Sequence, residues 1–245
     1  MSLGRLSRGV VLASVMCGLG TLHAASFSFS SFFTQDDQRQ VITFDGPSGS
    51  VTLVTFGYAG GVNQAGQVIP AGGFDPVLSL FDATGGLNSS SNLVAFTDST
   101  GCGGGVNQDP ATLSCFDEKL VLTTLLPGNT YALVLTQSDN LPVGPTYGDG
   151  FSQDGNGNFT PSEFGCAANS FCDANIPSSA RTGNWALDIL GVRSAEGPTS
   201  VPEPGGPWMP AGGAGGLVLL AIRKWRVDRH RGRTMASAKA RKDRP

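Results

Sequence analysis

The stretch LVLTTLLPGNTYALVL, residues 120–135, predicts two β-strands joined by a turn. Residues 120–125 and 131–135 are short apolar runs, and Pro127-Gly128-Asn129 between them are turn residues. Proline fixes its own φ angle, while glycine and asparagine accept a left-handed backbone. We therefore predict a β-hairpin here and an all-β fold around it.

Further strands are predicted on both sides of this hairpin. Residues 26–30 alternate polar and apolar side chains, which places Phe27 and Phe29 on one face of a strand. No window shows a sustained helical period flanked by capping residues. The remaining predicted strands cover residues 40–44, 51–58, 77–81 and 185–190. We predict an antiparallel β-sandwich of jelly-roll type over residues 25–193.

Residues 1–24 have the layout of a signal peptide. Arg5 and Arg8 precede an apolar run from residue 10 to residue 19, and Leu22-His23-Ala24 ends in a small residue suited to cleavage. We therefore predict that the chain is exported and that residue 25 begins the mature domain.

The domain that would remain after export is strongly acidic. The whole chain has a net charge of −3, but residues 25–200 contain sixteen acidic and four basic side chains, a net charge of −12. An acidic surface repels phosphate backbones, so nucleic-acid binding is disfavoured. Both histidines, His23 and His230, lie in the terminal segments, so a histidine base or a histidine-bound zinc site is excluded from the domain.

Four cysteines lie inside this domain, at Cys102, Cys115, Cys166 and Cys172. An even number of cysteines in an exported chain predicts disulfides, here two. Three pairings are open, and the simplest joins Cys102 to Cys115 and Cys166 to Cys172. Loops this short are expected to gain about 2–3 kcal/mol each from a disulfide.

One segment of the domain is a candidate calcium site. Asp154-Gly155-Asn156-Gly157-Asn158 places oxygen-bearing side chains at alternate positions, as calcium loops do. It departs from an EF-hand at Phe159 and Gly165, which occupy the positions of the invariant glycine and the bidentate glutamate. Two readings stay open: a partial calcium site at Asp154, Asn156 and Asn158, or a solvated turn. We expect no required cofactor, and calcium is the one candidate.

The C-terminal tail has three parts in a fixed order. Residues 194–207 form a linker rich in proline and glycine, in which Pro202 and Pro204 hold Glu203 extended. Residues 208–222 are uncharged but span only about 22 Å as a helix, against a hydrocarbon core about 30 Å thick. We predict a short transmembrane helix that anchors weakly, followed by a disordered basic cytoplasmic tail over residues 223–245.

This tail resembles the PEP-CTERM sorting segment of Gram-negative bacteria, whose motif matches Pro202, Glu203 and Pro204. The resemblance implies cutting near the motif by an exosortase, an inner-membrane cysteine protease, and delivery to the cell surface. Two features depart from the pattern, a glycine-rich apolar segment and a long basic extension after Arg226. The alternative is a proline-rich linker before an ordinary weak anchor.

Four segments of the domain carry a second resemblance: FGYAGGVN at 56–63, GGFDPVLSLFD at 72–82, LTQSDN at 135–140 and GNWALDI at 183–189. They look like a secreted, functionally uncharacterised family that often accompanies PEP-CTERM tails. LPGNTY at 126–131 is also similar to a unit of bacterial pre-peptidase C-terminal domains, small β-sandwiches appended to secreted enzymes. Both resemblances imply a β-sandwich, and neither implies an activity.

Together these features predict an exported structural or interaction protein of the cell surface, exopolysaccharide or biofilm matrix. The expected partners are an exosortase-type protease, exopolysaccharide and, transiently, the inner membrane, and we expect the protein not to be an enzyme. The alternatives are a calcium-assisted carbohydrate-binding module and a secreted hydrolase using paired carboxylates. Trp185, the one tryptophan of the domain, falls in a strand expected to be core, which weighs against a sugar platform.

Overall fold

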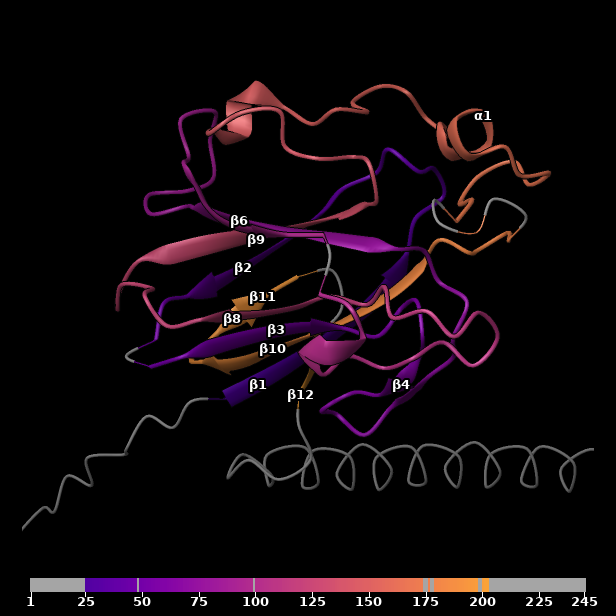
Figure 1. The fold of residues 1–245 in the computed structure, drawn as a ribbon. Helices are drawn as coiled ribbons and strands as arrows, with labels where there is room; N and C mark the ends of the chain where they lie inside the picture. The colour runs from indigo at the N-terminus through magenta and orange to yellow at the C-terminus, as the bar shows by residue number, and fades with distance from the viewer. Residues whose placement is uncertain are drawn as a thin grey trace, which may run out of the picture. The chain divides into compact units, whose positions relative to one another are not determined.

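The computed structural model describes residues 25–47, 49–98, 100–173, 176, 179–197 and 200–202. These residues are mostly β, and they form two five-stranded sheets and a separate two-stranded hairpin. The first sheet has the order β12-β1-β10-β3-β8, and the second has the order β11-β2-β9-β6-β7. Figure 1 shows the two sheets as stacked layers. The predicted signal peptide, Glu203, Pro204 and the tail after them lie outside the described residues.

The strands of the first sheet are β1 (Ala25–Phe32), β3 (Val51–Thr55), β8 (Lys119–Leu122), β10 (Asn184–Val192) and β12 (Ser200–Pro202). Those of the second sheet are β2 (Gln40–Asp45), β6 (Pro76–Asp82), β7 (Leu93–Thr97), β9 (Thr130–Gln137) and β11 (Ala195–Glu196). The separate hairpin consists of β4 (Gly61–Val62) and β5 (Val68–Ile69). Three short helical turns are η1 (Cys102–Gly104), η2 (Tyr147–Asp149) and α1 (Thr160–Phe164).

The main apolar core lies between the two sheets. Phe29 and Leu187 of the first sheet share one cluster with Ile42 and Leu133 of the second. Phe27 packs against the same cluster, which confirms that it shares a face with Phe29. Burying a side chain of this size contributes about 1.5–3 kcal/mol, so the contact between the sheets is the main source of stability.

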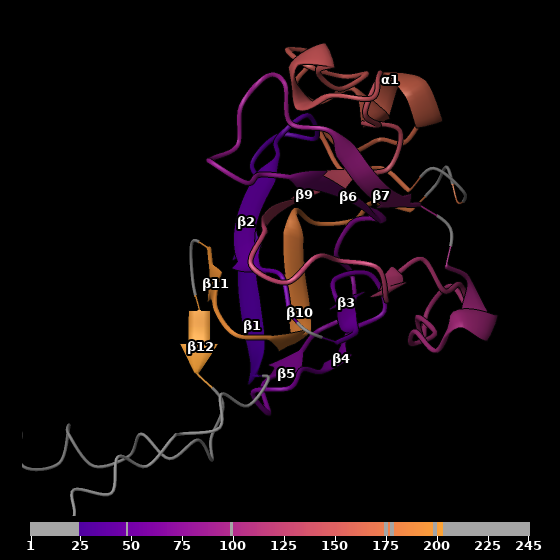
Figure 2. The same ribbon diagram turned by 90° about the vertical axis from the view of Figure 1, so that its left-hand side faces the viewer.

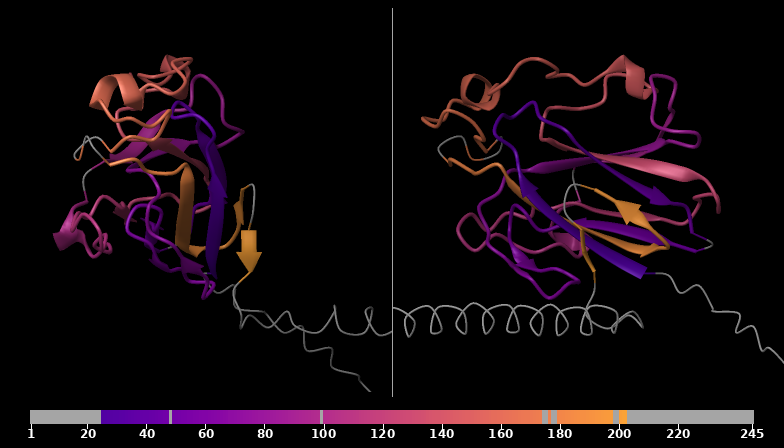
Figure 3. Two further views of the ribbon diagram at one scale, coloured as in Figure 1. Left: turned by 90° about the vertical axis from the view of Figure 1, so that its right-hand side faces the viewer. Right: turned by 180° about the vertical axis from the view of Figure 1, so that it is seen from behind.

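Two loop regions cover the outer faces of the sheets. Residues 138–165 pass over the second sheet, where Phe151 packs on Phe81 in a small separate cluster. The β4–β5 hairpin lies on the first sheet, because the backbone N–H of Gln64 donates to Asp188 Oδ2 at 2.8 Å. Figures 2 and 3 show these two coverings on opposite sides of the molecule.

The predicted hairpin at 120–135 is wrong. β8 pairs with β3 in the first sheet, whereas β9 pairs with β2 and β6 in the second. The residues between them cross from one layer to the other, and the Leu126 N–H donates to Tyr131 Oη at 2.9 Å. β9 is a central strand with seven of its eight residues buried, so neither of its edges is free for β8.

The other strand predictions are largely confirmed. The segments at 26–30, 40–44, 77–81 and 185–190 lie within β1, β2, β6 and β10. The predicted strand at 51–58 ends at Thr55, because the chain turns at residues 57–59. β7 at the edge of the second sheet is absent from the predicted set.

The predicted disulfide pairing is confirmed. Cys102 and Cys115 are bonded with their Cα atoms 4.9 Å apart, and Cys166 and Cys172 with theirs 5.8 Å apart. The first bond ties η1 to the segment before β8, and the second lies just after α1.

The sheets extend past residue 193. β11 and β12 lie inside the range expected as a linker, 194–207, and each pairs at the edge of a sheet. Within the described residues no helix is long and apolar enough to cross a membrane. The segment predicted to do so, 208–222, lies outside them.

Truncation of Leu133 to alanine tests the position of the core. The side chain is fully buried between the sheets, so Leu133→Ala is expected to lower the free energy of unfolding by about 2–5 kcal/mol. The matched control is Val121→Ala, at a side chain that is 55% exposed, with an expected change below about 0.5 kcal/mol. Urea denaturation measures both, and equal effects would contradict the core assignment.

Candidate functional site

Arg181 anchors a buried polar cluster beyond the ends of β3, β6 and β10. Its guanidinium carbon lies 3.6 Å from the centre of the Tyr58 ring, and its Nη2 donates to Asp109 Oδ2 at 2.9 Å. The same guanidinium donates to the backbone oxygens of Tyr58 and Gly73, each at 2.9 Å. Tyr58 Oη donates to Asp173 Oδ2 at 2.5 Å. Burial of the Tyr58 hydroxyl raises its pKa, and the hydrogen bond to Asp173 raises it further. One cation therefore joins four separate loops.

Buried carboxylates near this cluster hold backbone N–H groups. Asp117 accepts from the N–H groups of Tyr58 at 3.1 Å and Ala59 at 2.7 Å. Asp36, in the loop between β1 and β2, accepts from the N–H groups of Thr160 at 2.9 Å and Phe171 at 2.8 Å. An N–H buried without an acceptor would cost about 1–3 kcal/mol, so these carboxylates stabilise the loops.

Three acidic side chains near the Arg181 cluster have raised pKa values; they are Asp75, Asp117 and Glu118. Burial raises the pKa of Asp75 well above its usual value, and the negative charge of Glu118 adds to the effect. The Asp75 carboxyl is 4% exposed and makes no side-chain hydrogen bond to a described residue. Burial also raises the pKa values of Asp117 and Glu118, although hydrogen bonds from Thr100 and Thr97 oppose the shift of Glu118.

The residues predicted to bind calcium lie together on an exposed turn over the second sheet; they are Asp154, Asn156 and Asn158. Asp154 Oδ2 accepts from the Phe151 N–H at 3.0 Å and lies 3.5 Å from Arg39 Nη1. Asn156 Nδ2 donates to Gln153 Oε1 at 2.8 Å. Among the described residues no three histidine, cysteine, aspartate or glutamate side chains converge on one point. The calcium site stays a prediction.

The sorting motif is described only at its first residue. Pro202 is the last residue of β12, which pairs with β1 at the edge of the first sheet. Glu203 and Pro204 lie outside the described residues.

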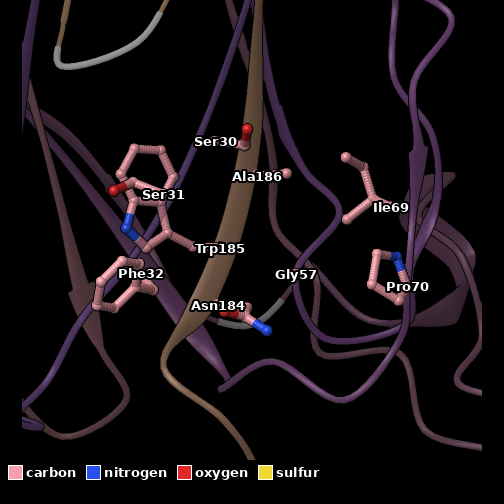
Figure 4. Close-up of a pocket in the computed structure, with 9 residues that line it drawn as sticks. All are labelled: Ser30, Ser31, Phe32, Gly57, Ile69, Pro70, Asn184, Trp185 and Ala186. Atoms are coloured by element: carbon pink, nitrogen blue, oxygen red, sulfur yellow. The ribbon is translucent and has the colours of Figure 1, made fainter.

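A pocket of about 300 Å³, which we call the hairpin pocket, lies between the first sheet and the β4–β5 hairpin. Figure 4 shows Ile69 and Pro70 of the hairpin side facing Asn184 and Ala186 of β10. The side chains of Asn184 and Phe32 are exposed, and Phe32 is 65% exposed. None of the lining residues is charged; they are Ser30, Ser31, Phe32, Gly57, Ile69, Pro70, Asn184, Trp185 and Ala186.

Sequence reasoning missed both the Arg181 cluster and the hairpin pocket. Each gathers residues from segments more than a hundred positions apart, so no local spacing predicts them. One signal was available for the cluster, since Arg181 is one of four basic residues in an acidic domain. Trp185 is 3% exposed, as expected for a core residue, and its Nε1 has no acceptor among the described residues.

Removing the buried cation is expected to destabilise the domain strongly. Arg181→Met leaves Asp109 and Asp173 without the guanidinium that lies 2.9 Å and 4.0 Å from them. Loss of one partner from a buried ion pair typically costs about 3–5 kcal/mol. Arg193→Met is the control, because Arg193 is exposed. Thermal and urea unfolding measure both variants, and equal stabilities would contradict the anchoring role.

Neutralising Asp75 is expected to make the domain more stable at neutral pH. Because burial raises the folded-state pKa of Asp75 above its unfolded value, its contribution is favourable at acid pH and is lost as pH rises through the folded pKa. Asp75→Asn removes that loss, so its Tm at pH 7 should exceed wild type by roughly a few degrees and converge with it below about pH 4.

The contrast for this measurement is Asp82→Asn. Hydrogen bonds from Thr84 lower the pKa of the half-buried Asp82, so this variant should not gain stability relative to wild type as pH rises. A Tm difference for Asp75→Asn that is independent of pH would contradict the assignment of a raised pKa.

No protein-family model matches this chain, and no curated protein sequence is significantly similar to it. The resemblances stated for the sorting motif and the domain therefore rest on the quoted residues alone. Function is best argued from the chemistry of the loops, the pocket and the two ends of the chain.

Proposed function

We propose that the chain is an exported, surface-directed structural or interaction protein, sorted and processed by an exosortase-type system and held in an exopolysaccharide or biofilm matrix. In this proposal its mature part is a passive β-sandwich that presents surfaces for binding. The signal-peptide layout of residues 1–24 and the Pro202-Glu203-Pro204 motif support export and sorting.

The observation that favours a structural or interaction role over catalysis is the use of the buried carboxylates. Asp36 and Asp117 each accept two backbone N–H groups, and Asp109 is paired with Arg181. Groups engaged in this way hold loops in place and are not oriented toward a substrate. A net charge of −12 over residues 25–200 would favour the solubility of the domain in a hydrated matrix.

The jelly-roll order is the finer part of the fold proposal. Successive strands β1, β2 and β3 alternate between the two sheets, and β8, β9 and β10 do the same. Chains that cross repeatedly between layers are typical of double-sheet Greek-key folds. This connectivity supports a sandwich with loops gathered at its ends.

A secreted hydrolase is the weaker alternative. Glycoside hydrolysis needs two carboxyl groups facing each other across a cleft. The hairpin pocket has no carboxylate in its lining. A second pocket of about 150 Å³ is lined by Asp45 and Glu196, but Asp45 Oδ2 accepts from Ser194 Oγ at 2.6 Å. The smaller pocket lies below the usual size of a ligand site.

Mass spectrometry of the termini tests the processing proposal. The full chain is expressed in a host with and without an exosortase-type protease, and the exported protein is expected to begin near residue 25 and to end near Glu203 only where the protease is present. Glu203→Ala should leave the basic tail attached, whereas Glu196→Ala in β11 should be processed normally. A wild-type exported protein that still ends at Pro245 would contradict the proposal.

A further inference from the structure

We infer that the hairpin pocket binds one sugar unit of a neutral polysaccharide; this inference rests on the proposed matrix role and names the ligand class. The pocket volume of about 300 Å³ is at the low end of the range for ligand pockets. It has room for one ring, and the remainder of a polymer would lie on the open surface beside it.

The electrostatics of the pocket favour an uncharged ligand. Sixteen acidic residues lie in the domain, yet the pocket lining has no charged side chain, either acidic or basic. An anionic sugar would enter without a cation to pair with and would be repelled by the domain's net charge of −12. A cationic ligand would find no carboxylate in the lining to compensate its loss of water.

The lining offers the two kinds of contact that a sugar ring uses. Phe32 is an aromatic ring that is 65% exposed, and Ile69 and Pro70 add apolar surface to the lining. Such groups pack against the C–H face of a ring. The Asn184 amide and the Ser30 hydroxyl make no side-chain hydrogen bond to another described residue, so they are available to hydroxyl groups of a ligand.

The strand pairing around the pocket disfavours an extended peptide as the ligand. Peptides that bind β-sheets usually add a strand to a free edge. β1 and β10 line the pocket, but β1 lies between β12 and β10, and β10 lies between β1 and β3. Both are interior strands of the sheet, so we expect recognition to come mainly from side chains.

This binding should not require calcium. The hairpin pocket lies on the first sheet, whereas the turn with Asp154, Asn156 and Asn158 lies over the second. A calcium ion at that turn would be on the opposite face of the domain and would not contact the sugar. The structure thus separates two features that the sequence allowed to be one calcium-assisted site.

Isothermal titration calorimetry on the full chain in detergent tests the inference, because it does not depend on export. The probes are neutral hexasaccharides of glucose, mannose and galactose, with a uronic-acid hexasaccharide and a neutral peptide for comparison. Phe32→Ala should weaken binding about tenfold and Asn184→Ala about fivefold. Two controls should bind as wild type: Phe96→Ala, at an exposed phenylalanine of β7, and Asn156→Ala in the opposite turn.

A neutral hexasaccharide that binds equally with calcium and with EDTA, and loses affinity in the two pocket variants alone, supports the inference. Three results would overturn it: no neutral sugar binds, the uronic-acid sugar or the peptide binds better, or Phe32→Ala and Asn184→Ala bind as wild type. Unfolding temperatures equal to wild type confirm that both variants fold. Normal processing at Glu203 with no sugar bound would reject this inference and leave the proposed function standing.

Discussion

Buried carboxylates that bind backbone N–H groups are the constraint on which this structure depends. A sandwich closes its core only if the loops at the strand ends fold over it without leaving polar groups unpaired. The domain has four basic side chains for sixteen acidic ones. Arg181 forms ion pairs with two of the buried acids, Asp109 and Asp173. Asp36 and Asp117 instead accept hydrogen bonds from backbone N–H groups, and these bonds stabilise both the carboxylates and the buried N–H groups.

The same constraint shapes what the domain can do. Carboxylates that accept hydrogen bonds from the backbone hold the loops and are not available for catalysis. The first sheet holds the β4–β5 hairpin in the same way, through Asp188 of β10 and Ser28 of β1. That hairpin forms one wall of an uncharged pocket on an otherwise acidic domain. A neutral, shallow site on a rigid sandwich suits reversible binding in a polymer matrix, which is why we favour an interaction role over catalysis.

Local sequence patterns predicted the strands better than their partners. A strand buried on one face alternates polar and apolar residues, as in 26–30, and a strand buried on both faces is apolar throughout, as in much of 77–81 and 185–190. Both patterns can be recognised in the sequence. Whether β9 pairs with β8 or with β2 and β6 depends on which edges are free in the finished sheets, and no local pattern records that. The Pro127-Gly128-Asn129 turn is real, but it joins two layers.

The Arg181 cluster and the hairpin pocket could not be predicted from the sequence for a related reason. Asp154, Asn156 and Asn158 are adjacent in sequence and drew attention, whereas Arg181, Tyr58 and Asp109 meet only after folding. The disulfides were predictable because the even number of cysteines and the expected export together favour disulfide bonds before any contact is known. Composition thus predicted the disulfides, whereas the topology brings the residues of the Arg181 cluster together.

Native-state hydrogen exchange at the amides of Tyr58, Ala59, Thr160 and Phe171 is the most direct test of this account. These loop amides donate to buried carboxylates, so we predict that they exchange as slowly as the central amides of β9, through global unfolding. Exchange at the rate of freely opening loops would contradict the claim that the carboxylates hold the fold together.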